Sequence, residues 1–101
     1  MRYILDVKLP LEKFNAAVSD GSAGAKMQKI IEDAKPEAVY FAARNGKRSG
    51  ILIINMENAS EIPKYAEPWF LQFDAELQFY PCMTPEDLAK AGLEGLGKKW
   101  G

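Results

Sequence analysis

Two short runs of hydrophobic residues between positions 38 and 56 have the pattern of a β-hairpin. The runs span residues 38–43 and 50–56, and Asn45-Gly46 lies between them. Both turn residues tolerate positive φ, which a type I′ turn needs at two successive positions. Side chains of a strand alternate between its faces, so the second run is hydrophobic on both: Ile51 and Ile53 on one, Leu52 and Ile54 on the other. A small domain has helices to cover one face, and we expect a second copy of the chain to cover the other.

Strands are also predicted near the two ends of the chain. Hydrophobic and polar residues alternate with a period of two over residues 2–9 and again over residues 74–82. Pro10 ends the first of these strands because proline has no N–H for the hydrogen-bond ladder.

Two helical regions separate these strands. The first has a joint at Asp20-Gly21 and stops at Lys35-Pro36. The second begins near Asn58 or Ser60, and Asn58 with Glu61 has the spacing of a capping box. Hydrophobic residues at helical spacing mark the buried stripes: Phe14, Ala17, Val18, Met27, Ile30, Ile31 and Ala34 in the first region, and Ile62, Tyr65, Ala66, Trp69, Phe70 and Phe73 in the second.

Two proline positions refine this prediction. Pro68 falls inside the second stripe and predicts a kink or a restart of that helix. Thr84-Pro85 opens a last helix, with threonine as the cap and proline in the first turn. Glycines at 92, 95 and 97 weaken this last helix, by about 1 kcal/mol each relative to alanine.

The order β-α-β-β-α-β with a terminal helix is the ferredoxin-like pattern of an α+β fold, here a single domain over residues 1–101. It predicts an antiparallel sheet of order 4-1-3-2, with both helical regions on one face. The helices would meet Leu5, Val7, Val39, Phe41, Leu52, Ile54, Leu77 and Phe79. The opposite face would carry Ile4, Asp6, Lys8, Tyr40, Ile51, Ile53, Asn55, Glu76, Gln78 and Tyr80. Two isoleucines and two tyrosines together are unusual on a solvated face.

Composition narrows the range of functions. The net charge is −1, and Ile51 and Ile53 occupy the central strand where RNA-binding sheets carry stacking aromatics, so we expect no nucleic-acid partner. No run approaches the roughly 20 apolar residues of a membrane span, and we expect no membrane partner and a cytoplasmic protein. Cys82 is the single cysteine, which excludes an internal disulfide. The chain has no histidine, which excludes a Ser-His-Asp triad, a conventional zinc site and a proximal haem ligand. We expect no cofactor.

Three segments carry a resemblance to known proteins: residues 35–41 (Lys-Pro-Glu-Ala-Val-Tyr-Phe), 66–71 (Ala-Glu-Pro-Trp-Phe-Leu) and 83–88 (Met-Thr-Pro-Glu-Asp-Leu). With the order of elements, they resemble a small bacterial family of uncharacterised proteins in the dimeric α-β barrel group. The resemblance implies that two ferredoxin-like sheets pair face to face in a homodimer. The group includes cofactor-free monooxygenases, muconolactone-type isomerases, haem enzymes and ligand-sensing modules. The haem branch relies on a histidine, so that function does not carry over.

Polar residues of the first and last strands form the main candidate site. In the order 4-1-3-2 these strands are antiparallel neighbours, which places Lys8 opposite Glu76 and Asp6 near Gln78. One interpretation makes Asp6 or Glu76 a catalytic base of raised pKa in a mostly apolar cavity. The other makes the four residues a cross-strand polar cluster that fixes the register of a dimer.

Further side chains have a binding and a structural interpretation each. Tyr40, Tyr80 and Arg44 would orient a substrate carboxylate or enolate, although Arg44 adjoins the turn and is equally consistent with a solvated position. Trp69 and Phe73 would form the walls of an aromatic pocket, or belong to the core. Lys47-Arg48 is interpreted as the solvated end of the hairpin.

Two functions remain open on this sequence. The first is the cofactor-independent binding or conversion of a small, partly apolar molecule in a cavity between sheet and helices. Asp6 and Glu76 would then act as acid–base groups, with Tyr40, Arg44, Trp69, Phe73 and Tyr80 as binding residues. The alternative is a non-catalytic dimerisation or ligand-sensing module.

Overall fold

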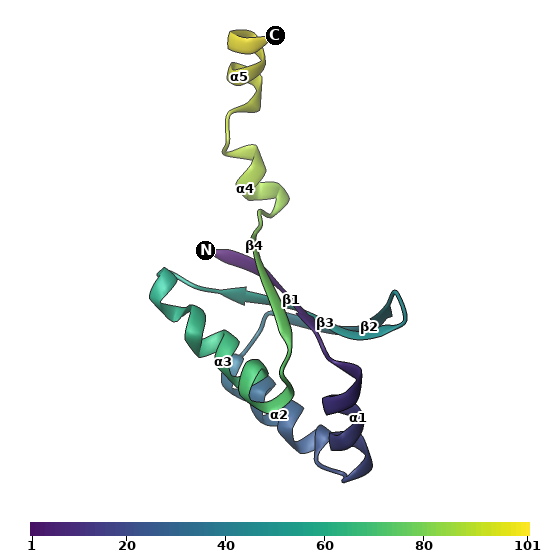
Figure 1. Ribbon diagram of the computed structural model, residues 1–101. Coiled ribbons are helices and arrows are strands. Elements are labelled where there is room, and N and C mark those ends of the chain that lie inside the picture. Colours follow the sequence, from purple (N-terminus) through teal and green to yellow (C-terminus); the bar gives the residue numbers. More distant parts are fainter.

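The computed structural model describes residues 1–101 and consists of a four-stranded antiparallel sheet, three helices packed against it and a projecting C-terminal segment (Figure 1). The elements in chain order are β1 (Arg2–Lys8), α1 (Leu11–Ser19), α2 (Ala23–Ala34), β2 (Ala38–Arg44), β3 (Lys47–Asn55), the 3₁₀ turn η1 (Ala59–Glu61), α3 (Ile62–Phe73), β4 (Glu76–Pro81), α4 (Pro85–Ala89) and α5 (Leu93–Trp100). The α+β class is therefore confirmed.

The sheet has the order β2-β3-β1-β4, with all neighbouring strands antiparallel. Read from the other edge, this is the order 4-1-3-2. The register places Lys8 opposite Glu76 and Asp6 opposite Gln78, as the sequence predicts. On the β3 side, Asp6 lies opposite Ile51. Asp6 is therefore on a central strand of the sheet, with β3 on one side and β4 on the other.

The β2–β3 hairpin closes with the predicted two-residue turn. Asn45 and Gly46 have φ of 53° and 72°, and Arg44 pairs with Lys47 across the turn. Both strands continue up to this turn and are longer than the hydrophobic runs that predicted them, because ladder pairing continues through polar residues once register is set.

The helical regions follow the sequence pattern with one exception. The first divides into α1 and α2 at Asp20-Gly21, where Gly21 has a φ of 83°. The capping box of Asn58 and Glu61 forms at η1, directly before α3. The expected restart at Pro68 is wrong, because α3 runs through this position without interruption. Buried side chains precede and follow the proline, and their shared packing keeps the helix in one piece.

The core lies between α1–α3 and one face of the sheet. Leu5, Val7 and Leu52 point into it from the sheet and are fully buried, as are Trp69 and Phe73 of α3. The other face of the sheet, here called the open face, has no helix packed on it. Phe41 departs from the prediction: it belongs to the helix side but is 50% exposed, because β2 is an edge strand.

The C-terminal segment, residues 85–101, forms an arm that points away from α1–α3 (Figure 1). The expected last helix is divided in two by Gly92, whose φ is 71°. Every residue of the arm is exposed. The radius of gyration is 17.0 Å, whereas a compact domain of about 100 residues has about 13 Å. The longest extent of the molecule, 59 Å, is twice the next, 29 Å.

Candidate functional site

The open face presents hydrophobic side chains in register across the sheet. Ile53 of β3 lies opposite Ala38 of β2 and opposite Ile4 of β1, and Ile4 in turn lies opposite Tyr80 of β4. Ile4 and Ile53 are partly buried, whereas Tyr80 at the edge strand is 46% exposed. The centre of this face is therefore a continuous apolar row with an aromatic end.

A second row adds the polar candidates. Tyr40, Ile51, Asp6 and Gln78 lie opposite one another in that order across the four strands. Tyr40 is 67% exposed at the β2 edge. The Tyr80 hydroxyl donates to the side-chain oxygen of Gln78. Sequence periodicity had placed all of these residues on this face, and the structure confirms that grouping.

Asp6 is engaged by Arg44, which lies 38 positions away in the chain. The guanidinium of Arg44 donates from Nη2 to the Asp6 carboxylate and from Nε to the Ser49 hydroxyl, the latter at 3.1 Å. Ser49 donates in turn to the carbonyl of Ala42 at 2.9 Å and is buried. The Asp6 side chain is only 12% exposed, against 41% for Arg44. The guanidinium therefore neutralises a largely covered carboxylate.

Glu76 does not join this pair. It lies opposite Lys8 in the register, but the two side chains form no ion pair, and both residues are exposed. The two carboxylates proposed as acid–base partners are thus in different surroundings. One is bound by a guanidinium, and the other faces solvent at an edge strand.

Trp69 and Phe73 lie on the other side of the sheet from Asp6. Their ring centroids are 6.2 Å apart, and Phe73 also contacts the ring of Phe14 at 5.0 Å. Both are fully buried within the core. Grouping them with Asp6 as walls of one pocket is therefore corrected: the sheet separates them, and they serve the core.

Sequence reasoning missed a slot between the hairpin and the helices. It encloses about 370 Å³ and is lined by Leu9, Phe14, Met27, Phe41, Ala42, Ala43, Arg48 and Ser49. Arg48 was expected at a solvated tip, but its guanidinium stacks over the Phe14 ring at 4.9 Å and donates to Asn15 at 2.7 Å. The alternation of side chains along β3 could have predicted this position, because it places Arg48 on the face of the sheet that the helices cover. We call this cavity the hairpin slot.

A polar cluster ties the ends of three strands together. Arg2 donates from Nε to both carboxylate oxygens of Glu37, at 2.9 and 3.0 Å, and Asn55 donates to the same carboxylate. These hydrogen bonds, from Asn55 first and then from Arg2, lower the pKa of Glu37. The bond to Glu37 raises the pKa of Arg2. Oδ2 of Asp87, at the start of α4, lies 3.8 Å from Nη1 of Arg2. The cluster therefore also contacts the base of the arm.

The chain has neither a cluster of potential metal ligands nor a helix that could span a membrane. The structure brings together no three Cys, Asp or Glu side chains in a manner that would hold a metal ion. None of its helices has both the length and the apolar composition that crossing a bilayer requires.

Comparison with known proteins places the chain in a family. A search of curated proteins gave no match. One family model, described as "Domain of unknown function (DUF3303)", matches residues 1–96 and so includes the sheet, the hairpin slot and most of the arm. The chain therefore belongs to the DUF3303 family of domains of unknown function.

Proposed function

We propose that this domain is a ferredoxin-like module of the dimeric α-β barrel group that forms a homodimer through its open face. We propose further that it binds a small, partly apolar molecule in the hairpin slot. Its strand order and one-sided helix layer support this fold assignment. Neither part of the proposal, dimerisation or binding, involves catalysis.

The apolar row across the open face carries the proposal of a homodimer. Ile53 and Ile4 occupy neighbouring central strands, and no helix of the chain covers them. Apolar rows of this kind are characteristic of protein interfaces rather than of solvated sheet faces. A two-fold axis would place the same row of a second copy against it.

The ion pair of Asp6 and Arg44 is compatible with burial against a partner. Each charge already has its counterpart within the chain, and Ser49 has both a donor and an acceptor partner. A second subunit would cover this cluster without leaving a charge unpaired, which is the condition under which buried ion pairs are tolerated.

The hairpin slot supports binding of a small molecule. Its volume of about 370 Å³ lies within the usual range of ligand pockets, and six of its eight lining residues are hydrophobic. Arg48 supplies a guanidinium beside this apolar lining, which suits a small carboxylic acid with an aromatic or aliphatic body. Binding is favoured over conversion because Asp6 is held by Arg44 on the opposite face of the sheet.

Sedimentation equilibrium at micromolar concentration tests the homodimer. The wild-type chain is expected as a dimer, and Ile53→Lys is expected to raise the dissociation constant at least about 100-fold, because two buried ammonium groups cost several kcal/mol. Leu11→Lys is the matched control, since Leu11 is 69% exposed on α1. A monomeric wild type, or equal dimerisation of the Ile53→Lys variant, contradicts the proposal.

Thermal denaturation with benzoate and hexanoate tests the slot. A ligand at 100 times its dissociation constant stabilises the folded state by about 2.7 kcal/mol and raises the melting temperature by roughly 10 °C. Ala43→Phe would fill the slot and abolish this shift, whereas Ala16→Phe at an exposed α1 position would not. A shift that survives Ala43→Phe, or no shift with either acid, counts against binding there.

A further inference from the structure

The hairpin slot contains one charged residue among its eight lining residues, Arg48, and no carboxylate of the chain neutralises it. The other two arginines, Arg2 and Arg44, are each paired with an acidic side chain. Arg48 is partly buried and stacks on the ring of Phe14, so its charge is less solvated than that of an ordinary surface arginine. A partly buried cation without a counter-ion favours an anionic ligand.

The free edge of the Arg48 guanidinium matches a carboxylate. Nη1 donates to Asn15 at 2.7 Å, whereas Nε and Nη2 have no acceptor within the chain. The backbone of the same residue is also fixed, because its carbonyl accepts the N–H of Leu9 at 3.0 Å. Two parallel N–H groups on one edge of a guanidinium bind the two oxygens of a carboxylate. Arg48 is therefore held in place with such an edge unused.

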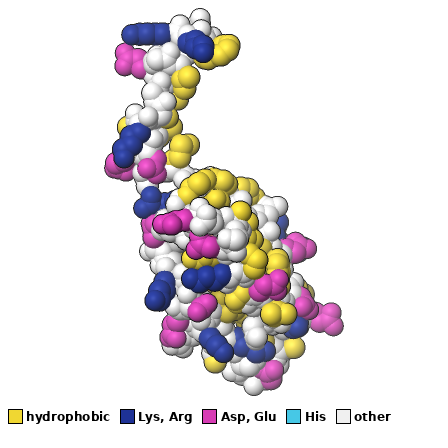
Figure 2. All heavy atoms as spheres, turned by 90° about the vertical axis from the view of Figure 1, so that its left-hand side faces the viewer, with side chains coloured by type: hydrophobic (Ala, Val, Ile, Leu, Met, Phe, Trp, Pro, Cys, Tyr) yellow, Lys and Arg dark blue, Asp and Glu magenta, His cyan; other side chains and the backbone are white.

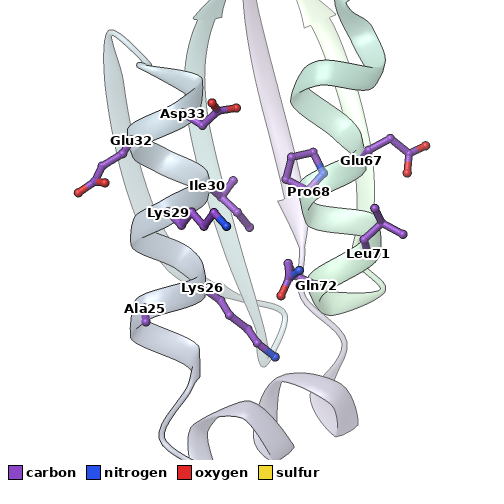
Figure 3. Close-up of a pocket in the computed structure, with 10 residues that line it drawn as sticks. All are labelled: Ala25, Lys26, Lys29, Ile30, Glu32, Asp33, Glu67, Pro68, Leu71 and Gln72. Carbon is purple, nitrogen blue, oxygen red and sulfur yellow. The ribbon is translucent and has the colours of Figure 1, made fainter.

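Other exposed parts of the molecule lack this combination. The apolar side chains on one side of the arm (Figure 2), which include Leu93 and Trp100, line neither the hairpin slot nor the groove between α2 and α3. That groove encloses about 850 Å³, but lysines and carboxylates both line it, among them Lys29, Asp33 and Glu67 (Figure 3). An anion there would meet negative side chains as well as positive ones. The hairpin slot joins an apolar lining to one unneutralised positive charge.

The apolar wall of the slot depends on the missing side chain of Gly50. This residue is buried in the middle of β3, a central strand, where glycine is usually unfavourable. Its φ is not positive, so the backbone conformation does not require glycine. A Cβ placed there would lie 3.3 and 3.4 Å from Cε1 and Cδ1 of Phe41, its register partner. The Phe41 ring therefore occupies the space of the absent side chain and lines the slot from that position.

Aromatic and thioether side chains from three elements line the slot: Phe41 of β2, Phe14 of α1 and Met27 of α2. An aromatic ligand gains ring–ring contacts with the two phenylalanines and sulfur–aromatic contacts with the methionine, which a saturated ring of the same size does not provide. Resting on the binding function proposed for the slot, we propose that its ligand is an aromatic carboxylate. Arg48 binds the carboxylate, and Gly50 determines the specificity because it seats the Phe41 ring.

Isothermal titration calorimetry with benzoate and cyclohexanecarboxylate tests the specificity, because the two acids have similar size and the same charge at neutral pH. The wild-type chain is expected to bind benzoate at least about fivefold more tightly. Phe41→Leu is expected to reduce this ratio to below about twofold, whereas Phe70→Leu, at an exposed position of α3, leaves it unchanged. Equal binding of the two acids by wild type overturns the aromatic specificity and leaves binding in the slot intact. No binding of either acid refutes both.

Gly50→Val tests the seat of the ring, because a branched side chain excludes Phe41 from its present position. Benzoate binding is expected to weaken at least about fivefold in this variant. Far-UV circular dichroism establishes that each variant is folded, and Phe41→Leu tests the same wall without adding bulk to the sheet. Unchanged benzoate binding by folded Gly50→Val contradicts the role of Gly50.

Comparison of benzoate with neutral benzamide tests the role of Arg48. Wild type is expected to prefer benzoate at least about tenfold, and Arg48→Met is expected to lose this preference. Lys47→Met, at the exposed end of the hairpin, is the matched control and keeps it. A preference for benzoate that survives Arg48→Met contradicts the assignment of this arginine as the carboxylate-binding residue.

Discussion

At the scale of single residues, the pairing with Arg44 neutralises the Asp6 carboxylate, which is mostly shielded from water. Asp6 lies between Ile51 and Gln78 in its row, and its side chain is 12% exposed. Because Arg44 supplies the compensating charge, removing the guanidinium would leave a carboxylate that water reaches poorly. The contribution of Arg44 to stability is therefore expected to exceed that of an ordinary surface arginine.

Arg44→Met is expected to lower the free energy of unfolding by about 1–3 kcal/mol, because the Asp6 carboxylate and the Ser49 hydroxyl lose a charged donor. Urea denaturation measures this change. Lys47→Met, at the neighbouring exposed position across the turn, is expected to change it by less than about 0.5 kcal/mol. The double variant with Asp6→Asn should recover part of the loss; full additivity of the two changes would contradict the coupling.

The pKa of Glu37 gives a pH dependence with a defined sign. Hydrogen bonds from Asn55 and Arg2 lower this pKa from its ordinary value of 4.5. A lowered folded-state pKa contributes stability that is complete above 4.5 and is lost as the pH falls below it. The stability difference between wild type and Glu37→Gln is therefore expected to be largest near pH 7 and to shrink towards pH 3.

Urea denaturation of both proteins at a series of pH values measures this difference. Glu67→Gln, at an exposed position of α3, controls for the loss of a carboxylate as such. A difference between wild type and Glu37→Gln that stays constant from pH 7 to pH 3 would show that the hydrogen bonds to Glu37 do not stabilise the fold.

At the scale of elements, α3 contains an unfavourable residue that its surroundings override. Pro68 lies seven residues into the helix, where it withholds an N–H from the preceding turn. The buried residues of α3, among them Ala66 and Trp69 on either side of the proline, fix the helix against the sheet. The burial of this helix face therefore outweighs the tendency of Pro68 to interrupt the helix.

Pro68→Ala is expected to raise the free energy of unfolding by about 1–3 kcal/mol, because alanine restores the missing hydrogen bond and has the higher helix propensity. Pro85→Ala is the matched control, since Pro85 occupies the first position of α4, where proline is well tolerated. Thermal and urea denaturation compare the two. An unchanged or lower stability of Pro68→Ala would mean that the proline ring itself contributes packing of similar value.

At the scale of the whole molecule, the sheet and its three helices enclose the buried core, and the arm extends beyond them. The arm contributes no buried residue to the core. Its base is fixed by Asp87, which caps α4 with Thr84 and lies near Arg2. The overall shape thus combines a packed domain with a segment whose apolar surface is directed outward.

Deletion of residues 90–101 is expected to change the unfolding free energy of the monomer by less than about 0.5 kcal/mol, because the removed residues make no core contact. The measurement belongs at protein concentrations low enough for the unfolding free energy to be independent of concentration, which separates folding from association. A loss of several kcal/mol in the unfolding free energy would show that the arm stabilises the folded domain.

The local elements of this protein were predictable because each is specified by neighbouring residues. Asn45-Gly46 fixed the turn and Thr84-Pro85 the start of α4, while periodicity assigned side chains to the two faces of the sheet. Topology rules then supplied the register of Lys8 with Glu76. The continuity of α3 through Pro68 was not predictable in this way, because the packing that holds it is tertiary.

The sequence by itself determined which residues share a face, since strand and helix periods are local geometry. The tertiary structure alone decided which of them touch. Arg44 reaches Asp6 across 38 positions, and Arg48 turns onto Phe14 to border the hairpin slot. The partner that a long, flexible side chain contacts depends on strand register, on the length of the side chain and on burial. Register and burial are defined only once the strands and helices have packed together.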